Sequence, residues 1–114
     1  ENEYEFKTII NKNHLNKAGI THGGFICSII DAGSGTAAHR SSKNFPCVTI
    51  SLDVKFIGPT KEKDEIIGLV KILKKTKSMI FLNCQLISKN NIIANASGVW
   101  KMLKTNQPNF GPGG

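Results

Sequence analysis

Apolar and polar residues alternate along much of this chain and predict five strands. The clearest alternation is in CVTISLDVKF, residues 47–56, where Thr49 and the other polar residues fall on the face opposite the apolar ones. The apolar face is expected to carry Val48, Ile50, Leu52, Val54 and Phe56. The other strands are expected at residues 3–10, 66–73, 79–87 and 92–103. Because short polar segments separate the last four strands, we expect antiparallel hairpins between them.

A helix is predicted between the first two strands, from about Gly23 to Arg40. One stripe of this helix consists of Ile26, Ile30, Gly33 and Ala37, and Phe25, Ile29 and Ala32 lie beside it. A helix that is apolar nearly all round should be buried. One buried helix covered by one antiparallel sheet gives an α+β fold class.

Length and composition fit a single globular domain, expected at residues 1–104, with a flexible tail at residues 105–114. No apolar run approaches the roughly 20 residues that a membrane span needs. The 15 Lys and Arg residues exceed the 8 Asp and Glu residues, giving a formal net charge of +7. Such an excess favours a polyanionic partner, which could be nucleic acid, an anionic membrane surface or a phosphorylated small molecule.

The three cysteines, Cys27, Cys47 and Cys84, form no pair at metal-binding spacing, and each lies among apolar residues. We expect free thiols in a reducing compartment inside a cell, and neither a metal site nor a cofactor. The compartment itself stays open, because a targeting segment would lie before Glu1.

Asp31 is the only acidic or basic residue between His22 and His39, in the middle of the predicted helix. An ionised carboxylate in an apolar setting is unfavourable unless it is paired or faces an opening. One interpretation is that Asp31 caps a turn or pairs with a neighbouring Lys. The other interpretation is that Asp31 faces a cleft and carries out chemistry.

Two glycines, Gly23 and Gly24, would stand at the first turn of this helix. The free backbone N–H groups there can stabilise a developing oxyanion, and glycine leaves them accessible. A tight turn with close packing would also explain the two glycines. Asn16 lies six residues before His22 in a predicted loop, and its amide could reach the same place.

Taken together, HLNKAGITHGGFICSIIDAGSGTAA resembles the PaaI-like acyl-CoA thioesterases of the hotdog superfamily. The shared pattern is Asn16, Gly19, His22, Gly23 and Gly24, followed nine residues after the His by Asp31. CVTISLDVKFIGPTK is also similar to the family's strand that ends in a Pro before a basic turn. The resemblance, which covers roughly Phe6 to Leu103, implies a long helix wrapped by a curved antiparallel sheet. It also implies a homodimer or a dimer of dimers, with active sites at the dimer interface.

The resemblance assigns a role to each residue that matches the family's motif. Asp31 would be the catalytic carboxylate, acting as nucleophile or as general base for water. The Gly23 N–H would polarise the thioester carbonyl, and the Asn16 amide would lie near that carbonyl or the attacking water. His22 would support the site, and Thr49 would position water. Asp31 would come from one subunit and Gly23 from the other.

Contacts to the rest of the substrate are expected at two places. Gly24 lies beside the carbonyl-binding turn of the predicted helix. The turn that carries Lys74, Lys75 and Lys77 is either a solvated face or a contact for the phosphates of coenzyme A.

The leading hypothesis is therefore an acyl-CoA thioesterase, and three alternatives were compared with it. A hotdog hydratase or dehydratase would pair a His with an acid, and no such partner stands at the spacing of those motifs. A non-catalytic acyl-CoA-binding or sensing domain would not need Asp31. Nucleic-acid binding is disfavoured, because aromatic residues are only 7% and none is interleaved with the lysines. The sequence leaves the acyl group open.

Overall fold

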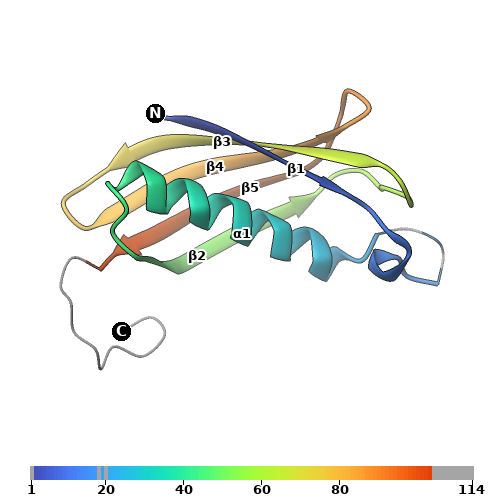
Figure 1. Ribbon diagram of the computed structural model, residues 1–114, viewed down its shortest axis with the longest axis horizontal. Helices are drawn as coiled ribbons and strands as arrows, with labels where there is room; N and C mark the ends of the chain where they lie inside the picture. The colour runs from blue at the N-terminus through green and yellow to red at the C-terminus, as the bar shows by residue number, and fades with distance from the viewer. Residues whose placement is uncertain (1, 18, 20, 104–114) are drawn as a thin grey trace.

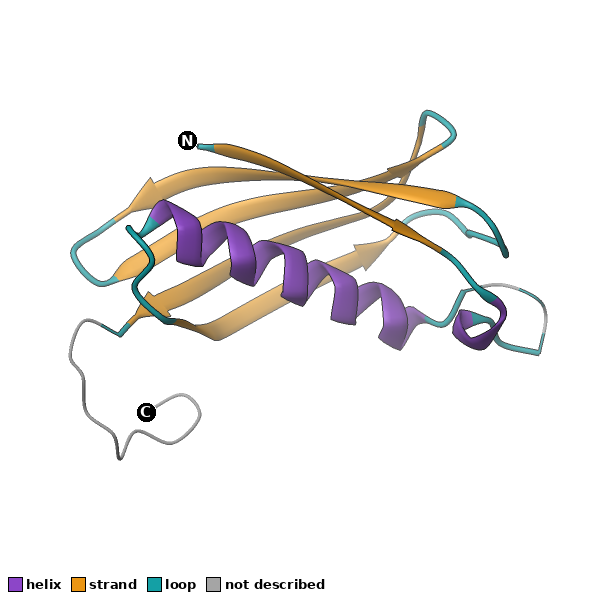
Figure 2. Cartoon of the chain, in the orientation of Figure 1, coloured by secondary structure: helices purple, strands orange, loops and turns teal. Residues whose placement is uncertain are grey.

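The computed structural model describes residues 2–17, 19 and 21–103, in which one α-helix packs against a five-stranded sheet (Figure 1). The elements are β1 (Glu3–Ile9), η1 (Lys12–His14), α1 (Gly23–Ser41), β2 (Cys47–Phe56), β3 (Glu65–Lys75), β4 (Met79–Ser88) and β5 (Asn91–Met102). Figure 2 shows α1 lying along one face of the sheet. The α+β prediction is confirmed. The tail predicted at residues 105–114 lies outside the described residues.

The strands follow the order β1-β3-β4-β5-β2, and all neighbours are antiparallel. The predicted hairpins from β3 to β4 and from β4 to β5 are confirmed. The predicted hairpin between β2 and β3 is wrong. β2 pairs with β5, and the connection to β3 passes the positions of β5 and β4 in the sheet. As an edge strand, β2 turns one row of its backbone N–H and C=O groups away from the sheet.

The helix buries one face against the sheet. Its buried residues are Ile26, Ile30, Ser34, Ala37, Ala38 and Ser41. Their spacing of three or four positions keeps them on one side of the helix. The expectation of a helix buried nearly all round is wrong for the single chain, because Gly24, Ser28 and Asp31 are exposed. Asp31 therefore does not lie in the core.

Two glycines allow β1 to pack close to the helix. Phe6 of β1 stands opposite Gly68 of β3, and its ring lies between Gly68 and Gly33 of α1. A Cβ atom added at either glycine would overlap the ring. The chain thus needs glycine at both positions to hold α1, β1 and β3 together.

An extra residue in β2 changes which side chains face the helix. The register shifts between Thr49 and Ser51, which makes Ile50 the extra residue of a β-bulge. Thr49 pairs with Trp100, whose side chain is buried on the face of the sheet that carries α1. Because paired residues share a face, Thr49 also faces α1. The single apolar face predicted for this strand is therefore wrong before the bulge and correct from Leu52 onward.

Candidate active site

Asp31 of α1 and Thr49 of β2 meet where the helix lies over the edge strand. The Thr49 Oγ1 hydroxyl donates a hydrogen bond of 2.9 Å to Asp31 Oδ1. Both residues line a shallow, open hollow of about 360 Å³ with Cys27, Ser28 and Leu52. Thr49 reaches the carboxylate because the bulge turns it toward the helix. Since Thr49 engages one carboxylate oxygen, the second oxygen can accept a proton or a hydrogen bond from a molecule in the hollow.

The helix begins with an accessible first turn. His22 is the N-cap residue, and its side chain makes no capping hydrogen bond to the described residues. Gly23 and Gly24 are both exposed, and neither has a positive φ. A Cβ atom added at Gly24 would meet no described atom within 4 Å. Neither a positive φ nor crowding by a described atom requires glycine at position 24, although glycine is a poor helix former. The exposed first turn leaves the backbone N–H groups there accessible.

The loop that carries Asn16 is tied to the start of α1 by its neighbouring residues. Leu15 and Thr21, on either side of it, form an antiparallel bridge. The next backbone N–H, that of His22, donates a hydrogen bond of 2.8 Å to the His14 carbonyl oxygen. The structure therefore sets His14 opposite His22 at the start of α1, and Asn16 follows two residues later in the same loop.

A buried hydroxyl pair, which the sequence did not reveal, fastens this loop to the connection between β2 and β3. Thr60 Oγ1 donates to Thr21 Oγ1 at 2.6 Å, and Thr21 Oγ1 and N–H donate to the Thr60 carbonyl oxygen at 3.1 and 2.9 Å. The two residues are only 2% and 7% exposed. The pair fixes the start of α1 beside the end of β2. The two residues lie 39 positions apart in the sequence, so no local sequence pattern predicts their contact.

Phe56, at the end of β2, lies against the first turn of the helix. A Cβ atom added at Gly23 would stand 3.5 Å from the Cε1 and Cζ atoms of the Phe56 ring. The edge strand thus touches Asp31 through Thr49 near its start and Gly23 through Phe56 at its end.

A single chain does not bring the two predicted catalytic groups together. Asp31 and Gly23 are eight positions apart on α1, which is about 12 Å along a helix at 1.5 Å per residue. Thr49 and Phe56 are seven positions apart on β2, which is about 23 Å along a strand. A small reacting group cannot touch both Asp31 and the Gly23 N–H of the same chain.

The three lysines predicted to contact phosphates are not brought into one site. A second bulge, in β3, turns Lys75 toward the helix, where its Nζ donates a hydrogen bond of 2.7 Å to the carbonyl oxygen of Ser41. Lys74 pairs with Phe81 on the opposite face of the sheet. Lys77 follows in the turn to β4 and is exposed. Lys74 and Lys75 therefore face different sides of the sheet.

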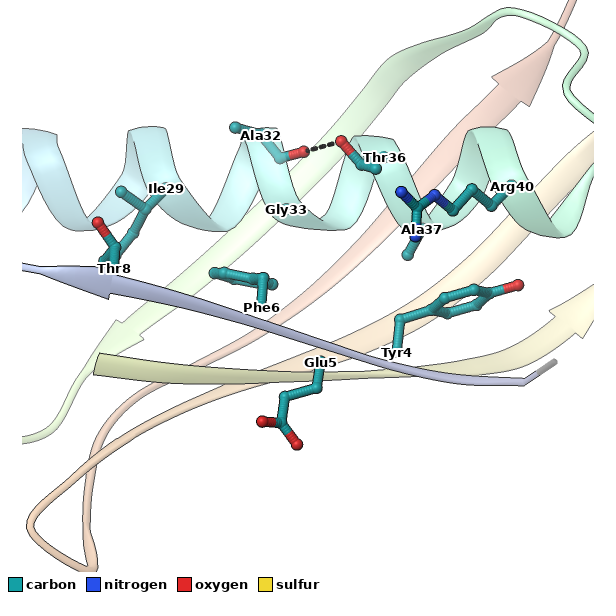
Figure 3. Close-up of a pocket in the computed structure, with 10 residues that line it drawn as sticks. All are labelled: Tyr4, Glu5, Phe6, Thr8, Ile29, Ala32, Gly33, Thr36, Ala37 and Arg40. Carbon is teal, nitrogen blue, oxygen red and sulfur yellow. Dashed lines mark hydrogen bonds between the residues drawn. The ribbon is translucent and has the colours of Figure 1, made fainter. Parts of the chain in front are cut away.

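A second hollow of about 360 Å³ lies between α1 and β1, on the other flank of the helix from Asp31 (Figure 3). Figure 3 shows Ile29 next to Thr8, the Phe6 ring beneath Gly33, and Arg40 toward one end. Its lining contains one carboxylate, that of Glu5, and Figure 3 shows this side chain pointing away from the helix. This hollow therefore presents no carboxylate to a bound molecule. The hollow that contains Asp31 is the better candidate for the active site.

The thiols and the remaining titratable groups do not form a second centre. Burial raises the pKa of the Cys47 and Cys84 thiols, which disfavours the nucleophilic thiolate. No group of three or more His, Cys, Asp and Glu side chains among the described residues is arranged to hold a metal ion. Within the same part of the chain, no helix is long and apolar enough to cross a membrane.

Known proteins share sequence with much of this chain. The family model of the thioesterase superfamily matches residues 18–94. Acyl-coenzyme A thioesterase 13 of Mus musculus is 29% identical over 80 residues, which are 70% of this chain and 57% of the mouse protein. The Pseudomonas aeruginosa protein PA0474 is 31% identical over 94 residues, covering 82% of this chain and 70% of its own length. The chain spans less than two thirds of the mouse relative.

Solved structures share the fold. The E. coli PaaI protein from the phenylacetic acid degradation operon superposes with a TM-score of 0.84 at 16% identity, covering 90% of this chain and 74% of that chain. The protein smu.793 from Streptococcus mutans, bound to acetyl CoA, gives a TM-score of 0.83 at 17% identity, covering 94% and 86%. At these identities the superpositions establish the common architecture of one helix against a curved antiparallel sheet.

Proposed function

Because the chain belongs to the thioesterase superfamily, we propose that it hydrolyses the thioester of an acyl-coenzyme A to a free acid and coenzyme A. Family membership and PaaI as a structural neighbour confirm the predicted resemblance, and the fold is the predicted hotdog fold. The name of the mouse relative and the acetyl CoA bound to the Streptococcus mutans protein support a coenzyme A thioester as substrate.

The observation that carries the proposal is the hydrogen bond from Thr49 to Asp31 at an open hollow. A hydroxyl that donates to one carboxylate oxygen fixes the direction of the carboxylate. An oriented carboxylate can take a proton from water or attack a carbonyl carbon itself. A thioester suits such a site, because its thiolate is a good leaving group and needs no strong acid to depart.

We infer a homodimer in which β2 pairs with the β2 strand of a second copy. The edge strand presents unpaired backbone groups along its ten residues. Antiparallel pairing about a two-fold axis sets the Thr49 end of one strand beside the Phe56 end of the other. Asp31 of one chain would then lie beside Gly23 of the partner subunit, which a single chain cannot achieve. A dimer of dimers, also expected from the resemblance, would leave this pairing unchanged.

In the shared site each group has one task. The Gly23 N–H, with the Asn16 amide near it and Gly24 leaving the turn open, receives the thioester carbonyl oxygen as it becomes an oxyanion. His22 holds the loop at the helix start through its backbone. In the general-base route, Asp31 takes a proton as the water oxygen bonds to the carbonyl carbon. The carbon–sulfur bond then breaks, and the thiolate of coenzyme A leaves and is protonated.

The test is a hydrolysis screen over short, long and aromatic acyl-CoAs with detection of the released thiol. Asp31→Asn should lower kcat by about 10²–10⁴-fold, the range expected when a placed base is lost, with the fold intact. The matched control is Asp53→Asn, because Asp53 is an exposed carboxylate of the same strand as Thr49 that pairs with Lys55 at 2.8 Å. Thiol release by Asp31→Asn at the wild-type rate would exclude this mechanism. Binding of acyl-CoA with no thiol release by the wild type would instead indicate a non-catalytic binding domain.

A further inference from the structure

Phe56 combines exposure with an unusual position. It is 57% exposed, yet it pairs with the fully buried Ala94 on the face of the sheet that carries α1. Its ring lies against Gly23, with two ring carbons 3.5 Å from the position that a Cβ atom would take. Because the nitrogen and the Cβ position share the same Cα atom, the Gly23 N–H lies within about 6 Å of these ring carbons. Any group bound to this N–H therefore comes into reach of the Phe56 ring.

The surroundings of the ring are apolar rather than polar. From the bulge onward, the helix-facing side chains of β2 are Leu52, Val54 and Phe56. Leu52 also lines the hollow that contains Asp31. This strip runs from the Asp31 side of the strand to the Gly23 side and offers no hydrogen-bonding side chain. A hydrocarbon chain gains about 0.8 kcal/mol for each CH₂ group it buries on such a surface, whereas an amide-bearing arm loses hydrogen bonds there.

We propose that Phe56 determines the acyl-chain specificity of this protein by packing its ring against the first carbons of the acyl group. The proposal rests on the proposed thioester hydrolysis and adds to it the residue that selects the substrate. A longer acyl chain would cover the ring, whereas an acetyl group, with one carbon beyond the carbonyl, would cover only a small part of it. The ring therefore favours longer chains over acetyl.

The experiment compares kcat/KM for octanoyl-CoA and acetyl-CoA in the wild type and in Phe56→Ala. The octanoyl-to-acetyl ratio should fall about tenfold or more in Phe56→Ala, because one lost apolar contact changes substrate discrimination by about 10–200-fold. Acetyl-CoA hydrolysis should fall by a smaller factor than octanoyl-CoA hydrolysis, because an acetyl group covers less of the ring. Phe56→Leu, which keeps an apolar side chain against the helix, should lower the ratio less and in the same direction.

The matched control is Ile57→Ala. Ile57 is the next residue, is also 57% exposed, and its N–H donates to the Ile93 carbonyl oxygen at 2.9 Å. Its side chain points away from the Phe56 side of the chain. The octanoyl-to-acetyl ratio should therefore be unchanged in Ile57→Ala.

The possible outcomes distinguish the role proposed for Phe56 from the proposed thioester hydrolysis itself. Sedimentation of each variant reports whether the assembly is preserved. If Phe56→Ala loses the wild-type assembly, Phe56→Leu decides, and an unchanged ratio there overturns the proposal. Equal losses for both substrates would also overturn it, because they indicate a general effect on the interface. In both cases thiol release by the wild type would leave the proposed hydrolysis standing. Absence of thiol release by the wild type would overturn the hydrolysis and the role of Phe56 with it.

Discussion

Mixing two inactive variants should restore hydrolysis if Asp31 and Gly23 act across a subunit interface. Asp31→Asn removes the carboxylate charge and keeps the shape of the side chain. Gly23→Val places a branched side chain at the first turn, where the Phe56 ring already lies 3.5 Å from the Cβ position. One homodimer then lacks the carboxylate and the other has its backbone N–H at position 23 blocked, in each case at both sites, so both parents should be inactive.

The structure gives the expected size of the recovery. Within one chain the two positions are about 12 Å apart along the helix. A hydrogen-bond donor must lie about 3 Å from the carbonyl oxygen, and the reacting atoms must come within about 3.5 Å. Only a heterodimer can combine a wild-type Asp31 with a wild-type Gly23, and it does so at one of its two sites. Random exchange of equal amounts yields heterodimers as half of the dimers, so activity should reach about a quarter of wild type.

The assay uses two affinity tags, one on each variant, so that the heterodimer can be purified after co-expression. The purified heterodimer should release thiol at about half the wild-type rate, because one of two sites is restored. The matched control pairs Asp31→Asn with Thr49→Val, since Thr49 contacts Asp31 within the same chain. That mixture should show no more than the mean of its parents. A purified heterodimer of Asp31→Asn and Gly23→Val with no recovery would refute the shared site.

Three further predictions concern stability and the substrate's charged end. Gly68→Ala should lower the free energy of unfolding in urea by about 1–3 kcal/mol, because the added methyl overlaps the aromatic ring packed on it, and an unchanged midpoint would contradict this packing. The backbone N–H of Lys61 donates a hydrogen bond to the Asp64 carboxyl and holds its pKa below the usual value. The stabilisation that this hydrogen bond gives the folded protein is present above the unfolded-state pKa and is lost as the pH falls through the folded-state pKa. Asp64→Asn should therefore lower the melting temperature at neutral pH and flatten its decline in acid, and parallel melting curves for both proteins would argue against it. If the turn after β3 attracts the phosphates of coenzyme A, Lys74→Glu with Lys77→Glu should raise KM for acyl-CoA, mainly at low salt. KM for acyl-pantetheine should stay unchanged. An equal loss of activity with both substrates would exclude this turn as the phosphate-binding site.

Much of the fold was predictable because its signals are local. Burial alternates residue by residue along β4 and, from Ala94 onward, along β5, and a two-residue turn leaves an antiparallel hairpin as the simple connection. The partner of β2 was not predictable in the same way. The connection of eight residues, 57–64, is long enough either to turn back or to cross the sheet, and only the packing of the whole chain decides. The bulge at Ile50 also leaves no mark, because an extra apolar residue fits an alternating pattern.

The candidate site was predictable in its members and not in its arrangement. The motif placed Asn16 and His22 in one loop at the helix start, and the structure shows that loop closed by contacts of the neighbouring residues His14 and Leu15, because residues close in sequence meet across a short loop. Strict alternation would have turned Thr49 away from Asp31, and only the bulge brings the two together. The alternation identifies Phe56 only as one more apolar strand residue, because it does not show where a strand ends relative to a helix.

The apparent conflict between an apolar helix and its central carboxylate has a structural answer. The helix has more apolar and small surface than its own sheet covers, and Asp31 lies on the uncovered part beside the free edge of β2. In the proposed dimer this surface would be covered by the partner subunit, so the carboxylate would lose water when the copies associate rather than when the chain folds. The hydrogen bond from Thr49 is already formed in the single chain and would offset part of that loss. A carboxylate that is oriented before assembly would meet the substrate in a fixed direction. In the proposed dimer the position of Asp31 would be explained by an interface, which neither the helix nor its own sheet supplies.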